Sequence, residues 1–122
     1  MRLYESAEMY LETIYVLSQK SACVRSVDVA EDMGYSKPSV SRAVGLLRQG
    51  GYLTVSKDGS LVLTEEGRLA AQKIFERHTV LSDFLAHIGV SGEVAARDAC
   101  KIEHVVSDDT IAAIKRFLDS HK

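Results

Sequence analysis

The feature that most limits the possible folds is a helix, a glycine break and a hairpin that follow one another between residues 36 and 63. Ser36 can cap the helix, and Pro38 falls in its first turn, where a missing N–H is harmless. Gly50 marks the end of the helix, and two short alternating segments then flank Asp58-Gly59, a strong hairpin signal. The sequence therefore predicts a helix that leads directly into a two-stranded hairpin.

Two further helical segments precede this stretch. Residues 6–17 have an amphipathic pattern, and Ser26 can cap a second helix that Gly34 ends. A short helix, a tight turn with glycine and another helix are typical of a helix-turn-helix, and the hairpin completes a winged helix-turn-helix. The alternative is an unrelated three-helix unit with an appended hairpin.

The second half of the chain is predicted to be helical. A long helix is capped by Thr64 and runs to about Gly89, a further helix begins at Ser91 and runs through Val106, and Ser107 caps the last one. The long helix exceeds what is needed to cover one small unit, so we expect its far half to belong to a second core. The fold class is mainly α with a small β-hairpin. Its expected domains are a winged helix-turn-helix over 1–63 and a helical domain over 64–122, with the long helix shared from about 64 to 89.

Charge is unevenly distributed along the chain, although the net charge is only −2. No Asp or Glu occurs from Met33 to Lys57, and this stretch contains several basic residues. Such a stretch in a helix-turn-helix indicates contact with DNA phosphates and bases. We expect Lys37 and Arg42 in the major groove and Lys57 of the wing on the backbone, whereas Arg48 is as readily a solvated charge. The candidate DNA-binding residues are Ser36, Lys37, Pro38, Ser39, Ser41, Arg42 and Lys57.

A thiol, a carboxylate and an imidazole are placed at helical spacing in Cys100, Glu103 and His104. Residues three and four apart share one helix face, so these side chains can converge. Sulfur, oxygen and nitrogen donors together suit a first-row divalent transition ion better than calcium or magnesium. The alternative is a buried cysteine beside two surface polar residues.

Three other candidate ligands, Met9, Glu12 and His78, each have an ordinary explanation as well. Met9 can be a core filler, Glu12 a solvated acid and His78 a surface residue.

The bulk composition is that of a globular chain, with 122 residues, 46% hydrophobic and 26% charged. Neither the N-terminal stretch Met1 to Glu5 nor any later segment has the apolar length of a membrane span. The two cysteines do not make a disulfide framework. We therefore expect a cytoplasmic protein of one domain, or of two small units.

The sequence resembles the metal-dependent repressors that comprise the diphtheria toxin repressor and the manganese transport regulators. The motifs that carry the resemblance extend over nearly the whole chain: residues 8–15 (EMYLETIY), 36–41 (SKPSVS), 63–67 (LTEEG), Arg77-His78 and 98–108 (DACKIEHVVSD). The resemblance implies a winged helix-turn-helix followed by a helical metal-binding and dimerisation region. It also implies a homodimer that binds an operator when loaded with Fe(II) or Mn(II).

Position by position, the sequence combines two branches of this family. Met9, Cys100, Glu103 and His104 match the principal site of the iron-responsive branch, whereas Glu12 and His78 match ligands of the manganese-responsive branch. The manganese branch has carboxylates where Met9 and Cys100 stand. The larger iron-branch proteins carry an additional C-terminal barrel domain, and we expect here the short manganese-type architecture, which the stretch up to Lys122 resembles.

These observations lead to the hypothesis of a metal-dependent transcriptional repressor that binds a double-stranded, palindromic operator as a homodimer and is not an enzyme. The expected ion is Mn(II) or Fe(II), with Zn(II), Co(II) or Ni(II) as surrogates. One alternative is a winged-helix regulator that senses an organic ligand or oxidation at Cys100. Another is a small metalloenzyme using the ion as a Lewis acid, although the sequence shows no separate nucleophile constellation.

Overall fold

The computed structural model describes residues 5–121, so the N-terminal stretch 1–4 and residue 122 lie outside the described residues. The elements in chain order are α1 (Glu5–Lys20), α2 (Ser26–Met33), α3 (Lys37–Gln49), β1 (Leu53–Val55), β2 (Leu61–Leu63), α4 (Glu65–His87), α5 (Gly92–Ile102) and α6 (Asp108–Ser120). The chain divides into two compact units, which we call the N-terminal unit (1–72) and the C-terminal unit (73–122). The expected helical fold with one small hairpin is confirmed.

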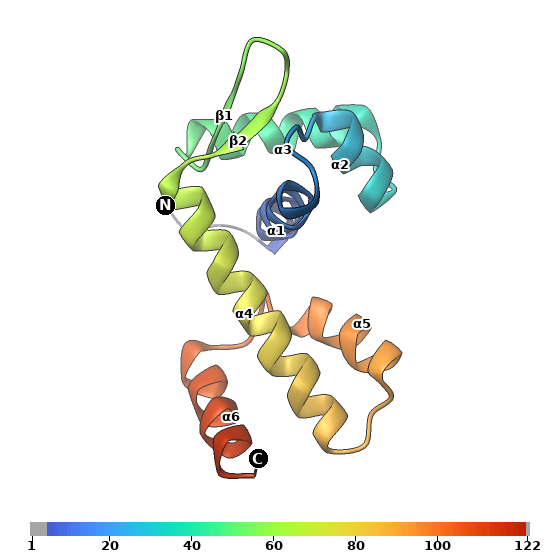
Figure 1. Ribbon diagram of the computed structural model, residues 1–122, viewed down its shortest axis with the longest axis vertical. Coiled ribbons are helices and arrows are strands. Elements are labelled where there is room, and N and C mark those ends of the chain that lie inside the picture. The colour runs from blue at the N-terminus through green and yellow to red at the C-terminus, as the bar shows by residue number, and fades with distance from the viewer. Residues whose placement is uncertain (1–4, 122) are drawn as a thin grey trace. The chain divides into compact units, whose positions relative to one another are not determined.

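The N-terminal unit packs three helices around one apolar core (Figure 1). Ser36 caps α3 as predicted, because the Ser39 N–H donates to Ser36 Oγ (3.3 Å). Gly34 ends α2 with a left-handed φ of 71°, which glycine adopts without steric cost. The core consists of Tyr10, Leu11, Ile14, Val24, Val29, Ala30, Val40, Ala43, Val44, Leu47, Leu53, Leu61 and Ala71.

Helix α3 has two distinct faces. Its buried residues Val40, Ala43, Val44 and Leu47 recur at helical spacing and join the core. Most of its remaining side chains are exposed to solvent. The core therefore fixes the position of α3, while its outer face is available to a partner.

The wing is an antiparallel hairpin in which Leu53 pairs with Leu63 and Val55 with Leu61. Its turn contains Gly59 with φ of 87°, and Asp58 Oδ1 accepts a hydrogen bond from the Ser60 N–H (3.0 Å). The predicted Asp-Gly turn is therefore confirmed.

Helix α2 begins differently from the prediction. We expected Ser26 as its cap, but Ser26 is the first helical residue and Arg25 is the N-cap. The Arg25 N–H donates to Asp28 Oδ2 (2.9 Å), so an acid in the first turn satisfies the backbone at the start of the helix.

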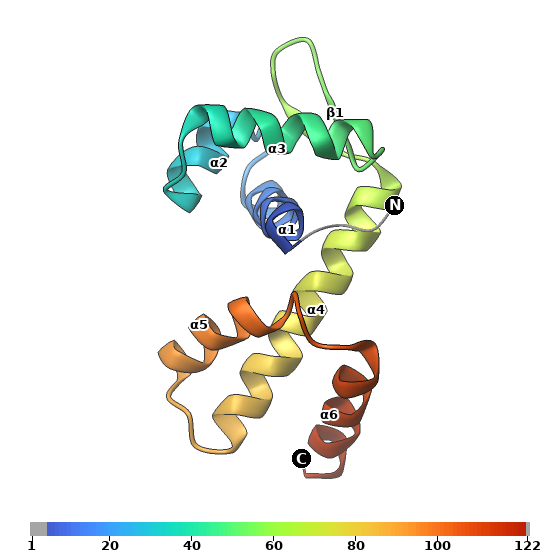
Figure 2. The same ribbon diagram turned by 180° about the vertical axis from the view of Figure 1, so that it is seen from behind.

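The C-terminal unit consists of the end of α4 with α5 and α6, which lie on opposite sides of it (Figures 1 and 2). Ser91 and Ser107 cap α5 and α6 as predicted. The buried core is small: Val80, Leu81, Ala99 and Ile111, with Ile102, Val106, Ile114 and Leu118 packed against it.

Helix α5 ends earlier than the sequence predicted. We expected it to run through Val106, but it stops at Ile102, so Glu103 and His104 lie in the turn that follows. The Glu103 N–H still donates to Ala99 O (2.9 Å), and the Val105 N–H donates to Ile102 O (3.0 Å), which tightens the chain after the helix. The expectation that Cys100, Glu103 and His104 share one helix is therefore wrong for Glu103, which caps the helix, and for His104.

Among the described residues, none of the helices has the length and apolar character that crossing a membrane requires. The expected functional boundary at 63/64 lies just before α4, whereas the division into compact units falls after residue 72, within that helix. That functional boundary stays a prediction.

Candidate metal centre and nucleic-acid interface

The C-terminal unit holds a buried carboxylate between two imidazoles. Glu103, which follows α5, is 1% exposed. Its Oε2 lies 2.8 Å from Nδ1 of His78 on α4, and its Oε1 lies 3.3 Å from Nε2 of His104. An ionised carboxylate is rarely buried without a cation or several donors, so this arrangement calls for positive charge close to Glu103.

The donor atoms fit a divalent transition ion. Among the described residues, Glu103 Oε1 has no hydrogen-bond partner, so its 3.3 Å contact with the His104 ring nitrogen lacks hydrogen-bond geometry. A carboxylate oxygen and an imidazole nitrogen that face each other without a shared proton can both donate electron pairs to one cation. The residues present are therefore compatible with Mn(II) or Fe(II).

Cys100 occupies the last turn of α5, one helical turn before Glu103, and is half-buried. A thiolate is a soft ligand that Fe(II) and Zn(II) accept more readily than Mn(II) does. Cys100 is therefore the candidate ligand that most affects the choice of metal.

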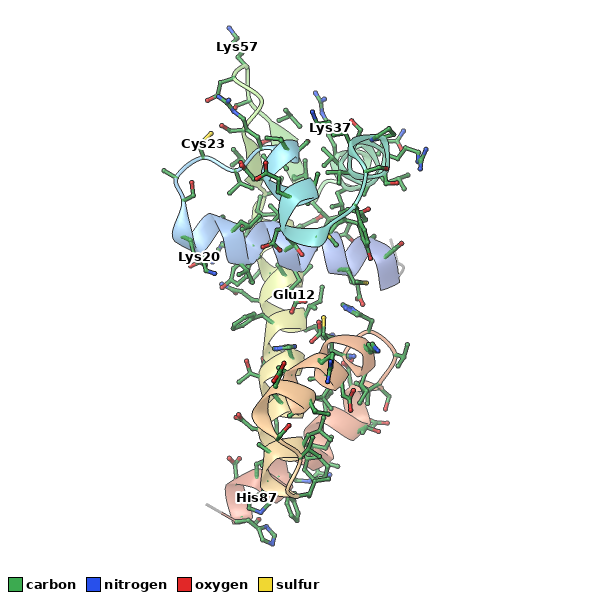
Figure 3. The ribbon with its side chains drawn as sticks, turned by 90° about the vertical axis from the view of Figure 1, so that its right-hand side faces the viewer. Glu12, Lys20, Cys23, Lys37, Lys57 and His87 are labelled. Carbon is green, nitrogen blue, oxygen red and sulfur yellow. The ribbon has the colours of Figure 1, made fainter. Side chains whose placement is uncertain are left out.

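The remaining candidates, Met9 and Glu12, lie on α1 in the N-terminal unit (Glu12 is labelled in Figure 3). They are three residues apart and half-buried, so they share one face of that helix. That they complete the site of the C-terminal unit stays a prediction.

Arg77, which the sequence did not indicate as a ligand or as a positioning residue, fixes the turn that carries Glu103. Its guanidinium donates to the backbone oxygens of Glu103 (3.1 Å) and Val106 (2.5 Å) and forms an ion pair with Asp108. It thus satisfies carbonyl groups that the early end of α5 leaves without helical partners. The available signal was an arginine beside the expected ligand His78, but no local pattern indicates which carbonyls it reaches.

Most of the candidate DNA-binding side chains lie on the exposed surface of the N-terminal unit. Lys37, Pro38, Ser41 and Arg42 are exposed on α3, and Lys57 is exposed in the wing turn. The Lys37 and Lys57 side chains project from the same end of this unit, away from α1 (Figure 3). This surface can meet an anionic backbone.

The two candidate serines at the start of α3 also have structural roles. Ser36 Oγ accepts the capping hydrogen bond, and its hydroxyl donates to Ser39 Oγ (2.9 Å). Arg42 Nη2 in turn donates to Ser39 Oγ (3.5 Å). Ser39 is half-buried, so the hydroxyl pair orients Arg42 as well as offering polar atoms to a partner.

Two family models match the chain, and together they span most of it. Residues 2–61 match the N-terminal DNA-binding domain of iron-dependent repressors, and residues 64–122 match their metal-binding and dimerisation domain.

Individual relatives point the same way. The chain is 36% identical over 117 residues to the transcriptional regulator MntR of Salmonella typhi, an alignment that covers 96% of the chain and 74% of that protein. It is 34% identical over 119 residues to the iron-dependent repressor IdeR of Mycobacterium bovis, covering 97% of the chain and 52% of that protein.

A solved structure of a manganese-dependent transcriptional repressor in complex with manganese superimposes with a TM-score of 0.86 at 30% identity, covering 93% of the chain and 52% of that structure. The chain thus spans about three quarters of the first relative and about half of the other two.

Proposed function

The chain belongs to the iron-dependent repressor family of metal-dependent, DNA-binding transcriptional repressors, and from this we propose that it represses transcription when Mn(II) or Fe(II) is bound. In the proposal the protein acts as a homodimer on a palindromic operator and regulates metal uptake or homeostasis. A DNA-binding regulator of this kind works in the cytoplasm.

The observation that carries the proposal is the buried Glu103 carboxylate between His78 and His104. These three residues and Cys100 would hold the ion, with Met9 and Glu12 of α1 as further ligands. The bound ion supplies positive charge that compensates the buried carboxylate and links its ligands. Because Cys100 must be a thiolate to ligate, binding releases a proton, and metal affinity rises with pH.

The proposed link between ion and operator follows from the placement of the ligands on different parts of the chain. Met9 and Glu12 belong to the DNA-binding unit, whereas the other ligands belong to the C-terminal unit. Ligands drawn from both units favour one arrangement of the two α3 helices in the dimer. Two helices that read one palindrome need a separation of about 34 Å, one turn of the duplex.

On the DNA side, Lys37 and Arg42 contact the major groove and Lys57 contacts the backbone. Ser36, Pro38, Ser39 and Ser41 line the same approach at the start of α3. The proposed functional domains are 1–63 for DNA binding and 64–122 for metal binding and dimerisation, with α4 shared between them.

The test is operator binding by fluorescence anisotropy under anaerobic, reducing conditions, with a duplex selected from a randomised pool. We expect Mn(II) or Fe(II) to raise affinity at least tenfold and a chelator to reverse the effect. Replacing the buried carboxylate by an amide in Glu103→Gln should abolish the response, whereas Glu93→Gln at the start of α5 should retain it.

An operator affinity that neither ion changes would overturn the proposal. If oxidation of Cys100 or a small organic molecule changed the affinity instead, the chain would be a winged-helix regulator that senses oxidation or an organic ligand rather than a metal. Circular dichroism of Glu103→Gln separates loss of metal from loss of fold.

A further inference from the structure

The outer face of α3 carries an apolar feature among its basic and polar residues. Leu46 is 56% exposed, and Gly45 beside it is also exposed. Together with Arg42 and Gln49, one turn away on either side, they line a surface hollow on this helix. A single exposed leucine needs no explanation, but the exposed glycine next to it in the helix does.

Gly45 has no reason within the fold to be a glycine. It lies in the middle of a helix, where glycine costs about 1 kcal/mol relative to alanine. A Cβ atom built at Gly45 would meet nothing within 4 Å. Gly67, in the first turn of α4, is different, because a Cβ there would lie 1.8 Å from the Tyr52 carbonyl oxygen. One helical glycine is thus required by packing inside the chain, and the other is not.

A glycine on an outward helix face permits a partner to approach the helix backbone. The charge of the surroundings indicates what that partner is. Helix α3 carries Lys37, Arg42 and Arg48 and no acidic residue, and Lys57 of the wing projects from the same end of the unit. An anionic partner with an apolar group at its surface fits both features, and the thymine 5-methyl group in the major groove is such a group.

We propose that Gly45 and Leu46 form a thymine-recognition site on α3. Gly45 lets the helix lie close to the base-pair edges, and Leu46 packs against the 5-methyl group of one thymine in each half-site. The proposal rests on the DNA-binding function above and adds a specificity contact to it. Arg42 and Gln49 flank this thymine-recognition site with side chains that can hydrogen-bond to phosphates or bases.

The experiment removes the methyl group from the DNA rather than from the protein. In the selected operator, each thymine is replaced in turn by deoxyuridine, and affinity for the Mn(II)-loaded protein is measured by anisotropy. We expect one thymine per half-site at which the replacement weakens binding about fourfold, the value for burying one carbon. Leu46→Ala should weaken binding to the thymine operator and remove the difference between thymine and deoxyuridine.

Gly45→Ala tests the close approach. It should weaken operator binding, while the thermal unfolding temperature stays the same or rises, because alanine favours the helix. The matched control is Ile88→Ala in the C-terminal unit, where Ile88 is 58% exposed, and we expect this variant to keep affinity and thymine discrimination.

Deoxyuridine that binds as well as thymine at every position would overturn the proposal, although metal-dependent operator binding would still stand. Retained discrimination in Leu46→Ala, or full affinity in Gly45→Ala, would also overturn it. The same holds if Leu46→Ala changes only the monomer–dimer equilibrium of the DNA-free protein, measured by sedimentation. Absence of any metal-dependent operator binding would instead remove the proposed function itself.

Discussion

Cys100 is the residue at which the choice of metal can be tested most directly. Its sulfur is the softest candidate donor of the C-terminal unit, beside the oxygens of Glu103 and the ring nitrogens of His78 and His104. Replacing it with a carboxylate, Cys100→Asp, substitutes a hard ligand that Mn(II) prefers. We expect the ratio of Mn(II) to Fe(II) concentrations needed for half-maximal operator binding to fall about tenfold.

Cys23 offers the control for this substitution. It is the other cysteine, lies exposed in the N-terminal unit and forms no disulfide. Cys23→Ser should leave the ratio unchanged. An unchanged ratio in Cys100→Asp would show that the thiol does not ligate.

Asp58 in the wing turn provides a prediction about acid. Hydrogen bonds from Ser56 and Ser60 lower the pKa of its carboxyl from 3.8 to about 2. A carboxyl whose pKa is lower in the folded protein stabilises the fold above its unfolded pKa, and this contribution is lost as the pH falls. The wing should therefore loosen between about pH 3.8 and 2, as followed by the Ser60 amide resonance in NMR spectra.

Asp58→Asn is the corresponding variant, since the amide does not titrate in this window. The Ser60 resonance should then show no transition between these pH values. A transition of unchanged size would assign it to another carboxyl.

Among the elements, the turn between α5 and α6 shows why part of the site was not predictable. The spacing of Ile102, Val105 and Val106 continues the helical pattern, so the sequence predicts a longer α5. The helix stops at Ile102, and Arg77, more than twenty residues earlier in the chain, takes the carbonyls of the turn. Local periodicity carries no information about such a contact, whereas the caps at Ser36, Ser91 and Ser107 depend on neighbouring residues and were predicted.

The candidate site divides in the same way. The candidate ligands followed from the motifs and their resemblance to the family, whereas the hydrogen bond between His78 and Glu103 did not. The 1% exposure of Glu103 and the role of Arg77 depend on packing between α4 and the end of α5. The sequence could therefore indicate candidate ligands but not the contacts that hold them in place.

Arg77→Lys tests the role of this arginine as a positioning residue. Lysine keeps the charge but cannot donate to two carbonyls and a carboxylate at once. We expect Mn(II) affinity to fall about tenfold or more, as for other groups that orient ligands, with a fold still detectable by circular dichroism.

Lys73→Met is the matched control, because Lys73 pairs with the same Asp108 (3.4 Å) but is 64% exposed. Water and salt screen an exposed ion pair, which therefore contributes little, so this variant should bind Mn(II) normally. Equal losses in the two variants would contradict a specific positioning role for Arg77.

For the molecule as a whole, the proposed mechanism is a coupling between ion and operator. If the ion raises operator affinity by some factor, the operator must raise ion affinity by the same factor. A factor of about 5 to 150 corresponds to typical coupling. Titrating Mn(II) with and without saturating operator measures it, and Glu103→Gln should show no Mn(II) response in either titration. An ion affinity that the operator does not change would contradict the mechanism.

The separation of α3 into a core face and an outer face has a consequence for how such regulators diverge. The helix is held in the core by Val40, Ala43, Val44 and Leu47. None of these residues belongs to the thymine-recognition site formed by Gly45 and Leu46. Substitutions on the outer face therefore leave the folding equilibrium nearly unchanged. A duplicated gene could acquire a new target sequence without first gaining stability, and a designer could retarget the regulator by the same route.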